Sequence, residues 1–106
     1  MSEDAAKRYL AVIQFAPHTS AGELAKRVPV LRSHISSFSN GEMEQFFRSP
    51  EGHLFGLLFK SAKPPPVMRS VLDAATTNAD ELMILEIGAA VEAKGFGPAL
   101  TWLQLH

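Results

Sequence analysis

The spacing of hydrophobic and polar residues changes several times along the chain. Four segments have the pattern of β-strands, namely Tyr9–Phe15, Glu42–Arg48, His53–Phe59 and Glu81–Ile87. The first and third are almost wholly apolar, whereas the second and fourth alternate apolar with polar or charged residues. Helical periods separate the first two and the last two strands, so the predicted order is strand, helix, strand, strand, helix, strand.

This βαββαβ order predicts an α+β fold, a ferredoxin-like sandwich with an antiparallel sheet in the order 4-1-3-2. Two helices should cover one face of the sheet, and a short C-terminal helix or tail should follow. Strands one and three should be central because both of their faces are apolar, whereas charged strands suit the edges. With 106 residues, enough for one hydrophobic core, the chain 1–106 is predicted to form a single domain.

The first helix should begin near Ala21, because Ser20 and Glu23 have the spacing of a capping box. Apolar residues then recur on one face over four turns. Pro29 falls inside this pattern, and because the pattern continues beyond it, we expect a kink rather than a break. The residues expected to face the core are Leu24, Val28, Leu31, Ile35 and Phe38.

Turn residues predict the remaining connections. Ser-Pro-Glu-Gly at 49–52 suits the turn of a hairpin between strands two and three. Gly56 leaves a gap in one face of strand three, which we expect a core side chain to fill. The prolines at 64–66 preset the start of the second helix, and Pro98 that of a short last helix. The second helix is expected to bury Val67, Val71, Leu72, Ala74 and Ala75.

Composition and charge narrow the functional classes. The chain has no cysteine, which excludes disulfides and thiolate metal sites. Ten basic and eleven acidic side chains give a net charge of −1, so there is no global attraction to nucleic acid or anionic lipid. No apolar run approaches the roughly 18 residues of a membrane span, and the charged N-terminal residues do not resemble a secretion signal. We therefore expect a cytoplasmic protein without a membrane partner.

Two local patterns bear on nucleic acids. Residues 1–70 hold nine Lys or Arg against six Asp or Glu, and Lys26, Arg27 and Arg32 on the first helix are the candidates for RNA contact. Gly52–Gly56 can be compared with the aromatic motif of RNA-recognition domains, but the match fails at the basic residue and at the aromatic partner of that motif, so we expect Phe55 and Phe59 to be buried rather than to stack on RNA bases. The histidines show no metal-ligand spacing, and no serine stands in a G-x-S-x-G motif.

Several short stretches, taken together, resemble one known group of proteins. They are Tyr9–Phe15, Phe59–Ala62, Asp80–Leu85, Gly95-Phe96 and Trp102-Leu103. On these residues the chain resembles the small ferredoxin-like proteins related to the CRISPR adaptation subunit and to GhoS-type antitoxins. That group is associated with metal-dependent cleavage of RNA or DNA, and the resemblance implies the same fold and pairing of subunits.

The resemblance also implies where a metal carboxylate should stand. In the group, the first strand usually ends in an aspartate, and paired subunits bring two such carboxylates toward one metal ion. Here Gln14 occupies that position. A neutral amide does not supply the negative charge that a hard divalent cation requires, so Gln14 indicates a degenerate metal position and a protein without cofactor or catalytic residue.

The leading hypothesis is therefore a small ferredoxin-like interaction or regulatory module that forms a homodimer. Glu86, Trp102 and Leu103 are the expected dimer contacts, and the alternative is that the C-terminal tail folds over its own sheet. A second hypothesis is a Mg²⁺-dependent endoribonuclease whose ligand is another acid, with Asp4, Asp73 and Asp80 as guesses. A third is non-catalytic RNA binding through the basic first helix.

Overall fold

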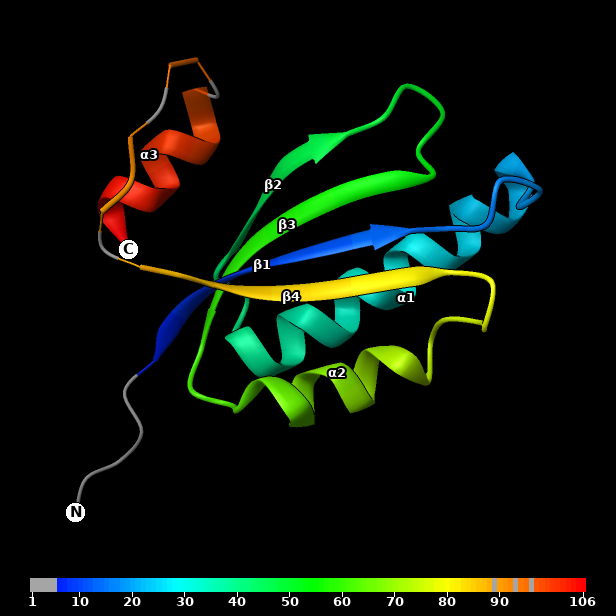
Figure 1. Cartoon of the computed structure of the whole chain (residues 1–106), viewed down its shortest axis with the longest axis horizontal. Helices are drawn as coiled ribbons and strands as arrows, with labels where there is room; N and C mark the ends of the chain where they lie inside the picture. The colour runs from blue at the N-terminus through cyan, green and yellow to red at the C-terminus, as the bar shows by residue number, and fades with distance from the viewer. Residues whose placement is uncertain (1–5, 89, 93, 96) are drawn as a thin grey trace.

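The structure is a computed structural model that describes residues 6–88, 90–92, 94–95 and 97–106. It contains one four-stranded sheet and three helices, shown in Figure 1. The elements in chain order are β1 (Lys7–Gln14), α1 (Ala21–Ser39), β2 (Met43–Arg48), β3 (Leu54–Ser61), α2 (Pro65–Asp73), β4 (Glu81–Ile87) and α3 (Gly97–Leu105).

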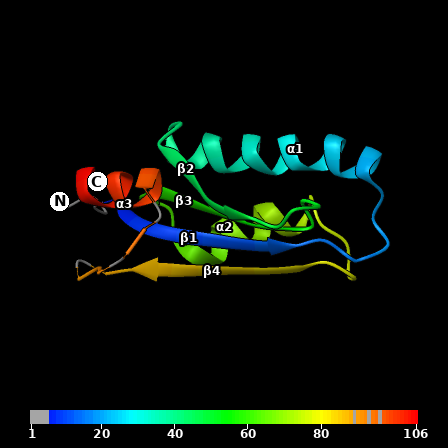
Figure 2. The same cartoon turned by 90° about the horizontal axis from the view of Figure 1, so that it is seen from above.

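The sheet has the strand order β2-β3-β1-β4, and each neighbouring pair is antiparallel. This confirms the predicted α+β, ferredoxin-like arrangement, with the two most apolar strands in the centre. Helices α1 and α2 pack on one face, whereas α3 packs on the opposite face near one end of the sheet (Figures 1 and 2). No helix in the described part of the chain has the length and apolar character needed to cross a membrane.

The main core lies between the sheet and α1 and α2, because alternate residues of β1 and β3 all point to this face. The helix α1 contributes the five residues expected from its apolar period: Leu24, Leu31 and Ile35 are buried, and Val28 and Phe38 pack against them. Ser20 caps the helix, since its Oγ accepts a hydrogen bond from the backbone N–H of Glu23 at 3.2 Å. Pro29 lies within an unbroken α1.

The helix α2 differs in part from its prediction in the residues that it buries. Pro64 precedes the helix and Pro65 begins it, as expected, and Leu72 is buried as predicted, but the second buried residue is Met68. Val67, which was expected in the core, is 47% exposed, and the helix ends at Asp73. Met68 and Leu72 are four residues apart and therefore lie on one face of the helix, and this face packs against the core.

Strand β2 also departs from the simple alternation that the sequence indicated. Its pairing with β3 shifts by one residue between Gln45 and Phe47, which is a β-bulge with Phe46 as the extra residue. Beyond the bulge, Phe47 lies opposite Gly56 on the face away from α1 and α2. A Cβ atom at Gly56 would approach the Phe47 ring to 2.5 Å, so this ring fills the gap predicted there.

A smaller cluster holds α3 against the second face of the sheet. Trp102 and Ala99 pack on Leu58 of β3, with Phe46 nearby. Arg8 of β1 adds two polar ties, because its guanidinium donates hydrogen bonds to the carbonyl oxygens of Leu103 and Gly88. The tail therefore folds over its own sheet, which is the alternative that the sequence left open.

Truncation of two phenylalanines should separate the main core from the smaller cluster. Phe55 is buried in the main core, whereas Phe46 is partly exposed beside α3. We expect Phe55→Ala to lower the free energy of unfolding by about 3–5 kcal/mol and Phe46→Ala by clearly less. Urea unfolding monitored by circular dichroism measures both losses, and equal losses would contradict the ranking.

Candidate functional site

The expected metal position lies at the end of β1 on the face away from α1 and α2. Gln14 is exposed and pairs with Leu54 of β3 and Glu81 of β4. Glu81 is thus a nearby carboxylate that the sequence did not associate with Gln14. Within the described ranges, however, no group of three or more His, Asp or Glu side chains is placed to hold a metal ion.

Asp80 lies next to the end of β1, but protein donors occupy both of its carboxylate oxygens. Oδ1 accepts the backbone N–H of Ala16 at 2.9 Å, and Oδ2 accepts the backbone N–H of Thr77 at 2.8 Å together with the guanidinium of Arg27. The Asp80 side chain is 0% exposed. This carboxylate therefore joins β1, α1 and the start of β4, and it has no free oxygen to offer a metal ion.

Of the other acids considered in the sequence, Asp73 is the one that the structure describes. Asp73 is exposed on α2 and forms an ion pair with Arg69 at 3.5 Å. Asp4 lies outside the described residues, as does Phe96 of the Gly95-Phe96 stretch.

The three basic residues of α1 do not form one patch. Successive residues of a helix are about 100° apart, so Lys26, Arg27 and Arg32 point in three directions. Arg27 is also engaged, since it pairs with Asp80 and lies over the Phe15 ring, with 4.6 Å between its Cζ and the ring centroid. Lys26 is exposed and Arg32 is half-buried.

The aromatic residues of the central strands are equally unsuited to stacking with bases. Tyr9, Phe55 and Phe59 lie under the helices and are buried. Burial, followed by the negative charge of Glu86, raises the pKa of the Tyr9 hydroxyl. The face that RNA-recognition domains use for stacking thus carries other residues here.

Of the three expected dimer contacts, Glu86 is the one that remains accessible. It lies exposed on β4, with its carboxylate 3.9 Å from the Nζ atom of Lys7. Trp102 is only 7% exposed because it packs on its own sheet, and Leu103 is half-buried beside it. A contact between Trp102 and a second copy would require α3 to move.

The sheet face opposite α1 and α2 is only partly covered, since α3 packs near one end of it. We call the remainder the uncovered face. Cross-strand pairing places Met83 beside Val12 and Val12 beside Gly56. The Phe47 ring lies over Gly56. Met83 is 51% exposed and Leu85 is 41% exposed, so apolar surface continues to the free edge of β4. The residues of the uncovered face are Val12, Gln14, Phe47, Leu54, Glu81, Met83 and Leu85.

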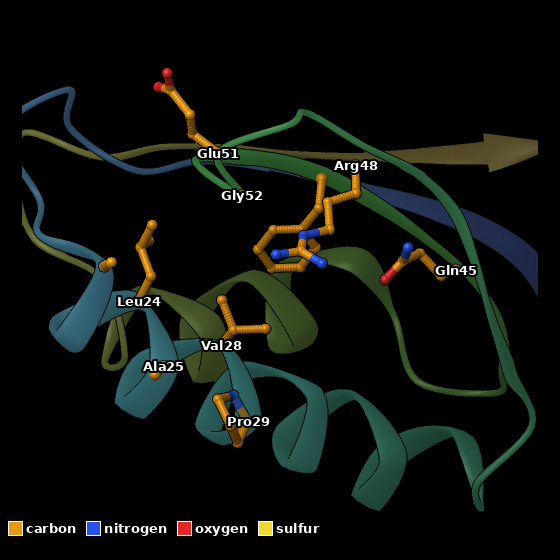
Figure 3. Close-up of a pocket in the computed structure, with 10 residues that line it drawn as sticks. Leu24, Ala25, Val28, Pro29, Gln45, Arg48, Glu51 and Gly52 are labelled. Atoms are coloured by element: carbon orange, nitrogen blue, oxygen red, sulfur yellow. The ribbon is translucent and has the colours of Figure 1, made fainter.

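A second candidate site lies on the helix side of the sheet, between α1 and the β2–β3 hairpin (Figure 3). This α1–hairpin groove has a volume of about 340 Å³. Its apolar lining comes mainly from Leu24, Val28 and Phe55, and its polar side chains are Gln45, Arg48 and Glu51. His53 holds the hairpin beside the start of α1, because its Nε2 donates to the carbonyl oxygen of Thr19 at 2.8 Å.

Neither site was foreseen from the sequence. The sequence predicted Glu81–Ile87 as a charged edge strand, but it did not show that Met83 and Leu85 lie beyond the reach of α3. The groove depends on the bulge at Phe46, and local periodicity carries no information on strand register.

Comparisons of the chain with known protein families, with characterised proteins and with solved structures find no match. The candidate sites are therefore interpreted from their own geometry.

Asp80 supplies a prediction for acid stability. Burial alone would raise its pKa, but the donors of Thr77, Arg27 and Ala16 outweigh burial and lower it from 3.8 to about 2. Because the folded pKa is depressed, the stabilisation is complete above the unfolded pKa and is lost as the pH falls toward 2. We expect about 2 kcal/mol of stability to disappear between about pH 5 and pH 2.

The variant Asp80→Asn should lose about 3 kcal/mol at neutral pH, since it leaves the half-buried Arg27 without its counter-charge. It should also show a smaller acid-induced decline than the natural chain. Asp73→Asn is the matched control, because Asp73 forms an exposed ion pair on α2. Urea unfolding as a function of pH measures these effects, and equal behaviour of the two variants would refute the role assigned to Asp80.

Proposed function

We propose that the chain is a small interaction or regulatory module that works as a homodimer, joined through strand β4. The observation that carries this proposal is the exposure of Met83 and Leu85 at the free edge of the sheet. A strand edge offers unpaired backbone donors and acceptors, and the apolar side chains beside it lose contact with water when a second strand is added.

The two edges of the sheet differ in a way that favours β4. The bulge at Phe46 interrupts the pairing of β2, and bulges are a common device that discourages pairing at an edge. Strand β4 pairs with β1 over Glu81–Ile87 without a register shift. It is therefore the more regular edge and the better template for another strand.

The sequence of β4 is self-complementary in an antiparallel pair. Full overlap of the seven residues places Ile84 on the twofold axis, which is the symmetry of most homodimers. Met83 then lies opposite Leu85 of the second copy on the uncovered face, and Glu86 lies opposite Leu82 on the helix face. No two glutamates are directly opposed, so charge repulsion does not oppose this register.

The resemblance to the CRISPR adaptation and GhoS group is part of the proposal. Paired subunits are what that resemblance implies, and Gln14 together with the engaged Asp80 supports assembly without a metal-dependent activity. On this proposal the dimer acts by binding, and its partner or target is recognised by surfaces that pairing of β4 leaves free.

The dimer is tested by changing its apolar contacts to charges. The double variant Met83→Lys, Leu85→Lys should be monomeric at micromolar concentration, because the two lysines would face one another across the twofold axis. The variant Val67→Lys should remain dimeric, since Val67 is similarly exposed but lies on α2, away from the sheet. Analytical ultracentrifugation measures the mass, and a monomeric natural chain would refute the proposal.

The register is tested separately by isotope-filtered NMR on mixed labelled and unlabelled chains. An intermolecular contact between the Met83 and Leu85 methyl groups is expected. If the chain is dimeric but the intermolecular contacts involve α3, the β4 interface would be refuted.

The nuclease hypothesis predicts that the chain cleaves RNA in the presence of Mg²⁺, whereas the interaction module does not. We expect the natural chain to leave structured RNA intact in the presence of Mg²⁺, because Gln14 is neutral and Asp80 is bound by protein donors. Gel electrophoresis of the RNA measures this, with Gln14→Asp as the comparison variant. Cleavage by the natural chain that requires Mg²⁺ would overturn the interaction module.

A further inference from the structure

The bulge in β2 gives the α1–hairpin groove its charge. Without the extra residue Phe46, strict alternation would direct Phe47 toward α1 and Arg48 toward the other face of the sheet. The shift instead places Arg48 opposite Phe55, whose side chain belongs to the core on the helix side. A bulge that re-aims one side chain in this way is a common feature beside binding sites.

The turn of the hairpin sets the position of the Arg48 guanidinium. Gly52 has a φ of +86° and is buried beneath this side chain. A Cβ atom at position 52 would lie 3.3 Å from Nη2 and 3.4 Å from Nε of Arg48. The absence of a side chain at Gly52 therefore allows the guanidinium to lie close to the turn, at the rim of the groove.

In the part of the chain that the structure describes, no carboxylate forms an ion pair with this guanidinium. Among the described residues, the ion pairs of the chain join other side chains, and Arg48 has none. Glu51 also lines the groove, but its carboxylate points away from the cavity (Figure 3). The groove thus presents one unpaired cation above an apolar floor formed by Leu24, Val28 and Phe55.

We propose that the α1–hairpin groove binds a small monocarboxylate with a compact apolar chain. The carboxylate accepts hydrogen bonds from Arg48, whose planar guanidinium suits a two-oxygen acceptor, and the apolar chain lies on Leu24, Val28 and Phe55. A volume of about 340 Å³ is near the lower end of the roughly 300–1,000 Å³ of small-molecule sites, so the ligand is small. The groove lies on the helix side of the sheet, and this proposal does not depend on the dimer.

The probe for the test is hexanoate, titrated into the ¹⁵N-labelled natural chain and monitored by NMR. The backbone amides of Ala25, Arg48 and Gly52 should shift in a saturable manner at millimolar concentration. Hexanol and hexylamine have the same chain without the carboxylate, and both should bind at least about tenfold more weakly. Equal shifts with all three compounds would show apolar association only and would overturn the assignment of a carboxylate site.

Two variants locate the site. Arg48→Gln should weaken hexanoate binding about tenfold, whereas Arg69→Gln, which removes an exposed arginine of α2, should leave it unchanged. Ala25→Phe should block the groove from the exposed surface of α1 while sparing the core. Undiminished binding in Arg48→Gln and Ala25→Phe, or no saturable shift in the natural chain, would overturn the proposal.

Discussion

The central strands carry apolar side chains on both of their faces, and the rest of the structure depends on covering them. The helices α1 and α2 cover these two strands on one face, where alternate residues of β1 and β3 are buried. The second face requires another cover, which the chain supplies only in part through α3. Arg8 strengthens that cover, because its guanidinium donates hydrogen bonds to the backbone carbonyl oxygens of Leu103 and Gly88. The uncovered face therefore exists because the central strands are apolar on both faces, whereas the second face is covered only in part by α3.

The features that were predicted correctly from the sequence are those that depend on the local spacing of apolar and capping residues. Two-sided apolar strands indicated which strands are central, and the spacing of Ser20 and Glu23 indicated where α1 begins. The prediction for α2 was right for Leu72 but wrong for Val67, because the apolar residues of this helix allow more than one buried face, and packing against the sheet selects Met68. The position of α3 could not be predicted from the sequence either, because the residue pattern of β4 is the same whether or not a helix covers Met83.

Gln14 and Asp80 illustrate the same limit at the candidate site. They are more than sixty residues apart in the sequence, and although the predicted strand order places the start of β4 beside the end of β1, it does not show what the Asp80 carboxylate contacts. The antiparallel pairing of β1 and β4 brings the two chain segments together. Whether Asp80 is free or engaged then depends on Arg27 and the backbone of Ala16 and Thr77, which are contacts of tertiary structure and leave no mark in the sequence pattern.

One extra residue in β2 links these separate observations. The bulge at Phe46 interrupts one edge of the sheet, and it thereby leaves β4 as the regular edge. It also directs Phe47 over Gly56 on the uncovered face, where the ring adds to the apolar surface beside Val12. Finally, it turns Arg48 to the helix side, where the guanidinium stands above the groove. Removal of the bulge would exchange Phe47 and Arg48 between the two faces, so both candidate surfaces depend on the same irregularity of strand register.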